Sequence, residues 1–289
     1  VLLSGVVLLS SCGRKKDETA SKENSTFQLT QLTPPDTKDA ATGDWLIRQE
    51  MSDAEKLNPT VTNDAAAQGI YIYIFEPLID VDRETYEIKP IIAKSAPVVS
   101  DDHMTYIFDL KENVTFSDGH PLTGEDVIFT IKTIKNPFTD AQALRNYFVD
   151  LKSVELVDGN KFKIKITMSK PYFKTVYTIG GTAITPKHIL DIDGMNDKFT
   201  WDDLNAAQKS INTKKYPDMQ KYADFLNSQE VSRDPKYVVG SGPYVLDKWI
   251  TGQSVTLKRN DNYWNKKDIP NFPGKLIFKT IQDQNAAVV

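Results

Sequence analysis

The chain has 289 residues, of which 40% are hydrophobic and 26% charged, a composition typical of a globular protein with a sizeable apolar core. Its 35 basic and 39 acidic residues give a formal net charge of -4, so the chain has no broad positive field for a nucleic-acid backbone or an anionic membrane surface. We therefore expect no nucleic acid among its partners.

The first nine residues, VLLSGVVLL, form an apolar run that ends close to the only cysteine of the chain. A membrane-spanning helix needs roughly 20 apolar residues, so this run is too short to cross a bilayer and has the length of a signal-peptide core. The string Leu9-Ser10-Ser11-Cys12 resembles the cleavage motif of bacterial lipoproteins, in which the cysteine thiol is lipidated. We interpret residues 1–11 as part of a lipoprotein signal peptide and Cys12 as the lipidation site.

The alternative for Cys12 is a buried free cysteine in a core helix, which the charged stretch directly after it disfavours. Up to residue 26 the chain is rich in Lys, Glu, Ser and Thr and lacks the apolar surface that packing against a domain requires. We therefore expect residues 12–26 to be a lipidated cysteine followed by a flexible tether. A coil of that length would hold the folded body roughly 20 Å from a bilayer.

Beyond the tether, the first predicted elements are a helix, a strand and a second helix. The run Ala65–Asp80 is apolar almost without interruption, too continuous for a half-exposed strand, and predicts a buried helix. Alternation over Tyr106–Leu110 predicts a strand, and the sequence SDG at 117–119 supplies the residues of a tight turn. Thr123 then precedes two acids and an apolar run, which is typical of a helix N-cap, and we expect Asp126 to orient that helix start.

Two hairpins are predicted further along the chain. The strand-like stretches Leu151–Leu156 and Lys161–Met168 are separated by the sequence DGN at 158–160, a strong hairpin signal. Tyr244–Leu246 and Val255–Leu257 likewise flank a turn centred on Gly252. Strands that alternate with helices, without an internal repeat, indicate a mixed α/β protein.

No catalytic or metal-binding pattern emerges from the sequence. The segment GSGP at 240–243 lacks the spacing of a serine nucleophile elbow, and we expect it to bend the backbone tightly into a central strand. His103, His120 and His188 lie apart in predicted loops or strand ends, with no pair at the spacing of metal ligands. The sequence therefore predicts no enzyme, no metal site and no cofactor.

Several groups of residues, in chain order, follow one family pattern. The most specific is the block Thr105–Val127, TYIFDLKENVTFSDGHPLTGEDV, which departs from the pattern at Lys111, where arginine is usual, and at Ser117, where histidine is frequent. The others are LNP at 57–59, IFEPL at 74–78, PIIA at 90–93, ITPKHIL at 184–190, GSGPYVL at 240–246 and RNDNYW at 259–264. Together they resemble the extracellular solute-binding proteins of family 5.

The resemblance implies an α/β fold of the periplasmic-binding-protein type, with two lobes (type II, cluster C). Residues 44–289 would form the first lobe with its inserted subdomain, and the second lobe would be largely missing from this sequence. It further implies the extracytoplasmic component of an ABC importer, which captures peptides in a cleft between the lobes and delivers them to a membrane permease. The same fold also carries other solutes, so an oligosaccharide, a nickel chelate or an opine-like compound stays open as the ligand.

With the predicted lipid anchor, the resemblance places the protein in the cell envelope, facing the periplasm, with the outer membrane or the cell surface as alternatives. We expect a monomer whose partners are a peptide or other small solute, an ABC permease and the lipid attached to Cys12.

Candidate ligand contacts follow only from the resemblance. In peptide-binding relatives the segment after the LNP-like motif touches the ligand, which here corresponds to Asn63, Asp64 and Ala65, although the first two would also serve as a helix N-cap. Aromatic residues after the long helix approach the cleft in relatives, which corresponds to Tyr147 and Phe148, with core packing as the alternative.

A third candidate segment, Gly180, Gly181 and Thr182, precedes the ITPKHIL motif. Glycines there would bring the backbone close to a ligand or to the hinge between lobes.

Overall fold

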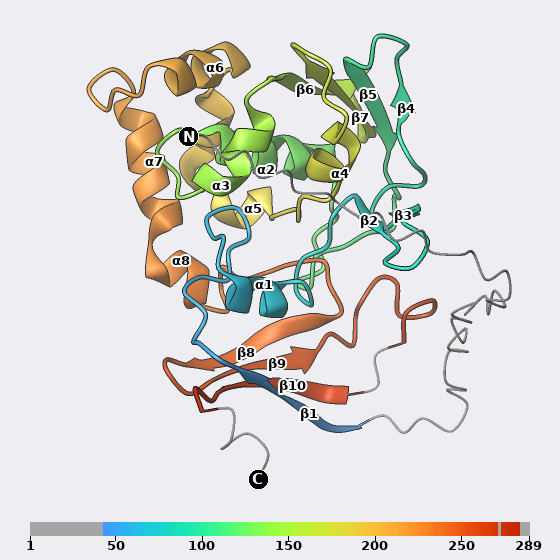
Figure 1. The fold of residues 1–289 in the computed structure, drawn as a ribbon, viewed down its shortest axis with the longest axis vertical. Coiled ribbons are helices and arrows are strands. Elements are labelled where there is room, and N and C mark those ends of the chain that lie inside the picture. Colours follow the sequence, from blue (N-terminus) through green and yellow to red (C-terminus); the bar gives the residue numbers. More distant parts are fainter. Residues whose placement is uncertain (1–42, 271–272, 284–289) are drawn as a thin grey trace, which may run out of the picture. The chain divides into compact units, whose positions relative to one another are not determined.

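Two four-stranded sheets, a two-stranded sheet and a set of helices make up residues 43–270 and 273–283, the part of the chain that the computed structural model describes (Figure 1). All of them belong to one unit, Ala41–Val289. The predicted signal peptide, Cys12 and the tether lie outside the described residues.

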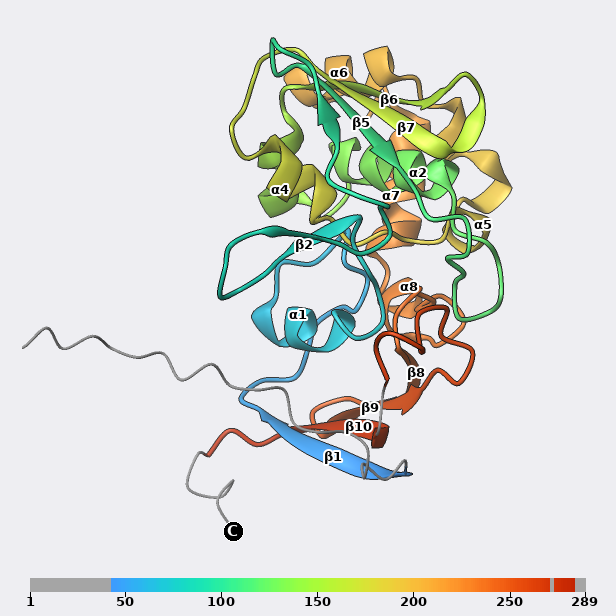
Figure 2. The ribbon, with the colours of Figure 1, turned by 90° about the vertical axis from the view of Figure 1, so that its right-hand side faces the viewer.

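The first sheet brings together strands from the two ends of this unit. Its order is β1-β10-β9-β8, with β1 parallel to β10 and the other neighbours antiparallel. Helix α1 packs over this sheet (Figure 2), where Ile70 joins Leu257 and Phe278 in an apolar cluster. The elements are β1 (Gly43–Glu50), α1 (Ala65–Tyr71), β8 (Tyr244–Ile250), β9 (Ser254–Arg259) and β10 (Pro273–Thr280). The strands expected around Gly252, whose φ is 71°, are confirmed.

The second sheet is antiparallel throughout, with the order β4-β5-β7-β6. Helix α2 packs against β6 and β7, and its side chains share a core with Phe108, Ile164 and Ile166 of the sheet. The elements are β4 (Val98–Val99), β5 (Thr105–Asp109), α2 (Gly124–Lys135), β6 (Leu151–Val157) and β7 (Asn160–Met168). The predicted strand at 106–110 and the hairpin at 151–168 are confirmed, since Asp158 and Gly159 both take positive φ, at 50° and 71°.

The remaining elements surround α2 or lie between the two large sheets. An apolar cluster with Phe129, Leu204 and Tyr222 joins α2 to α6 and α7. No helix among the described residues combines the length and the apolarity that crossing a membrane requires. The elements are β2 (Ile79–Val81), β3 (Ile88–Pro90), α3 (Gln142–Arg145), η1 (Asn146–Phe148), α4 (Thr175–Gly180), α5 (Lys187–Leu190), η2 (Ile192–Gly194), η3 (Asn196–Lys198), α6 (Trp201–Lys209), α7 (Pro217–Asn227) and α8 (Gln229–Arg233).

The start of α2 follows the sequence prediction. The Thr123 side chain accepts a hydrogen bond from the backbone N–H of Glu125, and the Asp126 carboxylate accepts one from the backbone N–H of Thr123 at 2.8 Å. Asp126 also accepts the N–H of Lys187 at 3.0 Å, so it ties α5 to α2. The expected N-cap and the orienting role of Asp126 are both confirmed.

The predicted helix over Ala65–Asp80 is wrong beyond its first two turns, because α1 ends at Tyr71. The carbonyls of Tyr73 and Ile74 accept hydrogen bonds from the backbone N–H groups of Tyr244 and Gly242, at 3.0 and 2.8 Å. The apolar run is therefore buried by pairing with a distant segment. The prediction that the GSGP segment enters a central strand is also wrong. In the described residues β8 stands at one end of its sheet, and the segment 73–74 pairs with residues at its start.

Glycine is required where these two segments meet. A Cβ on Gly240 would lie 2.0 Å from the carbonyl oxygen of Ile74, and one on Gly242 would lie 2.6 Å from that of Tyr73. The neighbouring atoms are backbone, so they have little room to move. The GSGP segment thus serves a close approach between two main chains.

We expect Gly240→Ala to lower the free energy of unfolding by about 3 kcal/mol, because the added methyl overlaps a backbone carbonyl. The matched control is Gly69→Ala in α1, where the new Cβ meets only the side chains of Arg48 and Glu50, at 3.5 and 3.7 Å. Alanine favours a helix over glycine by up to ~1 kcal/mol, so this variant should be unchanged or more stable. Urea denaturation measures both changes, and a Gly240→Ala protein as stable as the control would contradict the proposed contact.

Candidate functional site

A cleft of about 480 Å³ opens between α1, the β2–β3 hairpin, the α3–η1 segment and the end of α4. Its walls are mainly apolar and aromatic, with a few polar side chains placed among them, as is usual for small-molecule sites. Residues that illustrate the mixture are Tyr71, Phe75, Leu144, Tyr147, Thr178 and Ala183. We take this cleft as the candidate site.

The cleft brings together four of the residues expected from the sequence. Tyr147 and Phe148 line one side of it, and Gly181 and Thr182 line another. Tyr147 is 46% exposed, whereas Phe148 is 1% exposed and packs mainly into the core. Phe148 therefore has the core packing that was the alternative for this pair, while Tyr147 faces the cleft and solvent.

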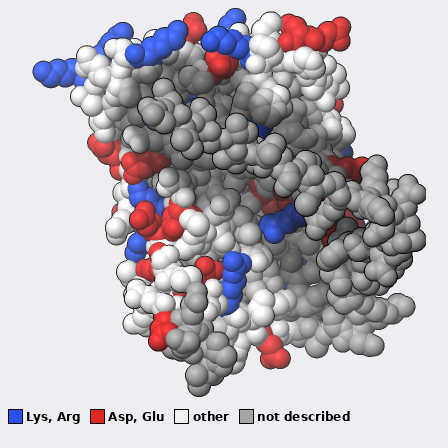
Figure 3. All heavy atoms as spheres, viewed as in Figure 1, with Lys and Arg blue, Asp and Glu red and all other residues white. Residues whose placement is uncertain are grey.

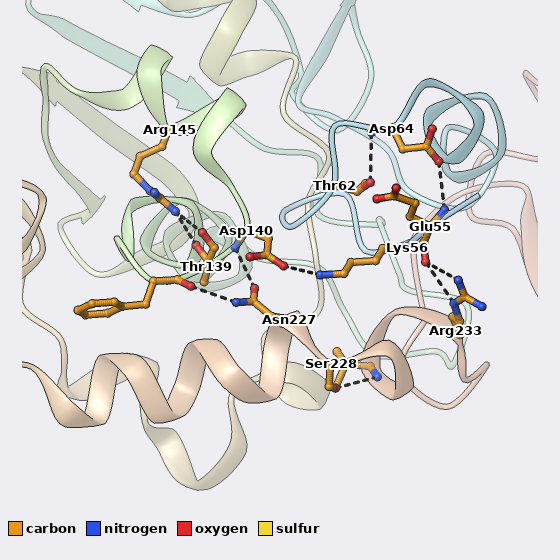
Figure 4. A network of polar contacts seen from close by, with 12 residues as sticks. Glu55, Lys56, Thr62, Asp64, Thr139, Asp140, Arg145, Asn227, Ser228 and Arg233 are labelled. Carbon is orange, nitrogen blue, oxygen red and sulfur yellow. Dashed lines mark hydrogen bonds and ion pairs between the residues drawn. The ribbon is translucent and has the colours of Figure 1, made fainter. Parts of the chain in front are cut away.

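Gly180 and the segment 63–65 do not line this cleft. A Cβ on Gly180 would lie 2.7 Å from the Ile79 side chain, so this glycine allows α4 to pack closely on β2. Asp64 is the N-cap of α1, accepting hydrogen bonds from the backbone N–H groups of Ala66 and Ala67, both at 3.1 Å. It also accepts the N–H of Glu55 (Figure 4), which fixes the loop before the helix. Of the two roles expected for Asp64, the cap is the one that its contacts fulfil.

A buried lysine fixes the wall that carries Tyr147 and Phe148. The ammonium group of Lys135, in the last turn of α2, donates hydrogen bonds to the carbonyls of Phe148 and Leu151, both at 2.9 Å. The side chain is fully buried, and burial lowers its pKa to about 8. Arg145 adds bonds to the carbonyls of Ile134, at 3.0 Å, and Thr139 (Figure 4). Sequence reasoning missed both residues.

Several polar side chains of the cleft have no hydrogen-bond partner among the described residues. They are Gln68, Tyr71, Arg83 and Tyr147, and none of them makes an ion pair in that part of the chain. Burial raises the pKa of Tyr71, so its hydroxyl stays protonated and able to donate at neutral pH. Uncommitted donors in a largely apolar cleft are the groups that a polar ligand would use.

The floor of the cleft is anchored by a buried carboxylate, Glu76, next to the cleft residues Phe75 and Pro77. Its oxygens accept hydrogen bonds from Ser241 Oγ at 2.9 Å, from Trp264 Nε1 at 2.8 Å and from the Tyr263 hydroxyl. Burial raises the pKa of Glu76, and the three hydrogen bonds offset that rise only in part. Residues from three of the sequence motifs therefore meet at one carboxylate, a role that the sequence did not reveal.

A second cavity, of about 350 Å³, lies beside α5 and the start of α2. It corrects the expectation that the histidines lie apart, because the rings of His120 and His188 stack with centroids 3.9 Å apart. Loop 116–121 and α5 come together there, and His188 Nε2 lies 2.7 Å from the Asp118 carboxylate. Burial would raise the pKa of Asp118, but the hydrogen bonds from His188 and from the backbone N–H of His120 outweigh it and hold the pKa low.

The charged groups of this second cavity are largely paired with one another. Lys187 Nζ lies 2.7 Å from Asp197, and Asp126 caps α2. Among the described residues, no group of three or more His, Cys, Asp or Glu side chains is arranged to hold a metal ion. On the described part of the face in Figure 3, basic and acidic side chains are interspersed. The first cleft, with its uncommitted donors, is therefore the better candidate for ligand binding.

Known proteins match this chain in sequence. The family model described as bacterial extracellular solute-binding proteins, family 5 middle, matches residues 87–289. Protein XP55 of Streptomyces lividans is 30% identical over 67% of this chain and 28% of its own length. The oligopeptide-binding protein AppA of Bacillus subtilis is 25% identical over 100% of this chain and 44% of its own length.

Solved structures match in fold. NikZ from Campylobacter jejuni in complex with Ni(L-His) is similar with a TM-score of 0.64 at 26% identity, over 85% of this chain and 41% of that chain. AppA from Bacillus subtilis in complex with a nonapeptide has a TM-score of 0.65 at 24% identity, over 86% and 42%. The chain thus spans less than half the length of these relatives.

Replacement of Glu76 by methionine is expected to destabilise the fold by about 3 kcal/mol, because three buried donors lose their acceptor. A carboxyl whose pKa is raised on folding binds more protons in the folded than in the unfolded state. The contribution of Glu76 to stability therefore falls as the pH rises above its ordinary pKa of 4.5. The difference in the free energy of unfolding between wild type and Glu76→Met should therefore become smaller as the pH rises.

Urea unfolding at a series of pH values measures this difference. The control is Glu84→Met, on the exposed turn of the β2–β3 hairpin, which should change stability by less than about 0.5 kcal/mol. Equal stability of the two variants at acidic pH would contradict the anchoring role of Glu76.

Proposed function

The chain belongs to family 5 of the bacterial extracellular solute-binding proteins, and on that premise we propose that its cleft forms one wall of a peptide-binding site in an ABC importer. Members of this family are solute-binding components of transporters. Because the chain spans 44% of AppA, we propose that residues outside this sequence supply the opposite wall. The whole protein would then deliver the captured peptide to a membrane permease.

The observation that carries the peptide proposal is the cleft of about 480 Å³ with uncommitted polar side chains on aromatic and apolar walls. Peptides offer main-chain groups that such donors and acceptors recognise, while side chains of different sizes fit pockets that keep some water. Two relatives whose names or titles state a peptide ligand, AppA and the oligopeptide-binding protein OppA of Salmonella typhimurium, support this choice.

The proposed contacts are the predicted residues that line the cleft: Tyr147, Phe148, Gly181 and Thr182. Asn63, Asp64, Ala65 and Gly180 would act indirectly, by setting the start of α1 and the packing of α4. An aromatic ring such as Tyr147 supplies a large contact area at a small cost in side-chain entropy.

A metal chelate is the second candidate, because NikZ, which matches this chain at 26% identity, was solved with Ni(L-His). Such a solute carries an amino acid around the metal, so the same cleft would recognise its organic part. Oligosaccharides and opine-like compounds remain further alternatives within this fold.

We also propose that the protein is held at the cell envelope by a lipid on Cys12. Residues 1–11 would be the end of a signal peptide and residues 12–26 a tether, with the folded body, from about residue 44, outside the cytoplasm as a monomer. The support is the apolar run before Cys12 and the extracellular family to which the chain belongs.

The peptide proposal predicts broad selectivity, because main-chain contacts are common to all peptides. In NMR titrations of the full-length protein, neutral pentapeptides with varied side chains should bind with dissociation constants within roughly 100-fold of one another. Tyr147→Ala should weaken all of them by about tenfold through lost aromatic contact. The control is Tyr172→Ala, since Tyr172 lines a different cavity. Saturable binding of maltotriose or Ni(L-His), with no response to any peptide, would overturn the peptide assignment.

The anchor proposal predicts that Cys12→Ser releases the protein from membranes, because two or more acyl chains bind a bilayer stably and none leaves only the folded body. Expressed in its bacterial host, the wild-type protein should partition into the detergent phase of Triton X-114, and the variant into the aqueous phase. A variant that stays in the detergent phase would show that Cys12 is not the anchor.

A further inference from the structure

The candidate cleft contains an unpaired cation, and from it we infer that the preferred solute presents a carboxylate to Arg83. This inference rests on the proposed function and narrows its ligand class, from peptides and other solutes in general to those with an acidic side chain or another carboxylate at the hairpin end of the cleft.

The position of Arg83 is fixed by the β2–β3 hairpin. Strands β2 and β3 pair with Val81 opposite Ile88, and Arg83 sits in the turn that joins them. The Asp82 carboxylate accepts the backbone N–H groups of Glu84 and Thr85, both at 2.9 Å, so the turn has a defined backbone. Because this turn is already ordered, a ligand that binds Arg83 does not have to order the main chain around it.

The other charged residue of the cleft is Asp80. The Asp80 carboxylate accepts the N–H of Val81 at 2.8 Å and stands opposite Lys89 in the hairpin register. The Arg83 guanidinium has no hydrogen bond or ion pair within the described residues. The cleft therefore offers the planar donors of Arg83 beside one carboxylate that already accepts a backbone hydrogen bond.

A carboxylate is the group that best matches this arrangement. A guanidinium binds it with two parallel hydrogen bonds, a geometry that an ammonium or hydroxyl partner cannot reproduce. The amide of Gln68 and the hydroxyls of Tyr71 and Tyr147 lie in the same cleft and supply further donors.

The test compares two pentapeptides, blocked at both ends, that differ only in a central Glu or Gln. In NMR titrations of the full-length protein, the Glu peptide should bind about five- to tenfold more tightly, as expected for a charge-assisted bond at a partly exposed site. The Nε–H signal of Arg83 should shift with the Glu peptide only. Arg83→Gln should bring the two affinities within about twofold by weakening the Glu peptide alone, and Arg83→Lys should keep part of the preference.

Lys221→Gln is the matched control, because it removes one positive charge from an exposed position on α7, away from the cleft. It should leave the preference unchanged. A preference for Glu that survives in Arg83→Gln, or equal binding of both peptides to wild type, would overturn the inference while leaving the peptide proposal intact.

Glutarate, a dicarboxylate without a peptide bond, distinguishes failure of the carboxylate inference from failure of the peptide proposal. If no peptide binds but glutarate shifts the Arg83 signal in wild type, the carboxylate inference holds and the peptide proposal fails. If neither glutarate nor any peptide shifts that signal, the inference is wrong.

Discussion

The buried carboxylate of Glu76 is the constraint on which the site depends. A charge in a dry interior is tolerated only when hydrogen bonds replace its water, and here the side chains of Ser241, Tyr263 and Trp264 supply them. These donors come from two segments far along the chain, so the carboxylate joins the start of the cleft to the residues just before β8 and just after β9. Gly240 approaches Ile74 closely at the same junction, because the donor Ser241 directly follows Gly240 in the sequence.

The site also depends on a rigid wall, the segment that carries Tyr147 and Phe148. Lys135 binds main-chain carbonyls on both sides of Val149, and Arg145 binds those at the end of α2. Main-chain contacts of this kind fix a segment without committing the side chains that face the cleft. The cleft therefore combines a fixed backbone with the uncommitted polar groups of Tyr71 and Tyr147, which is a suitable arrangement for a carrier of varied solutes.

Sequence reasoning succeeded where the determinants were local. The turn at Gly159 and the capping box of Thr123 depend on neighbouring residues, and both are confirmed. The α/β class and the periplasmic-binding-protein fold are likewise confirmed. It failed where distant segments meet: the apolar run after Tyr71 pairs with another main chain instead of continuing a helix. Neighbouring residues do not reveal the roles of Glu76 and Lys135, because their partners lie far away in the sequence. The role inferred for Arg83 depends on its having no partner among the described residues.

Photo-crosslinking locates a bound solute, which we expect in the cleft beside α1, α3 and α4. A pentapeptide with a central benzophenone-bearing residue would be irradiated with the full-length protein, and the adducts located by mass spectrometry. We expect adducts within residues 142–148 and 178–183, lost in competition with unlabelled peptide. Adducts that are equally competed but confined to the cavity around His120 and His188 would contradict this expectation.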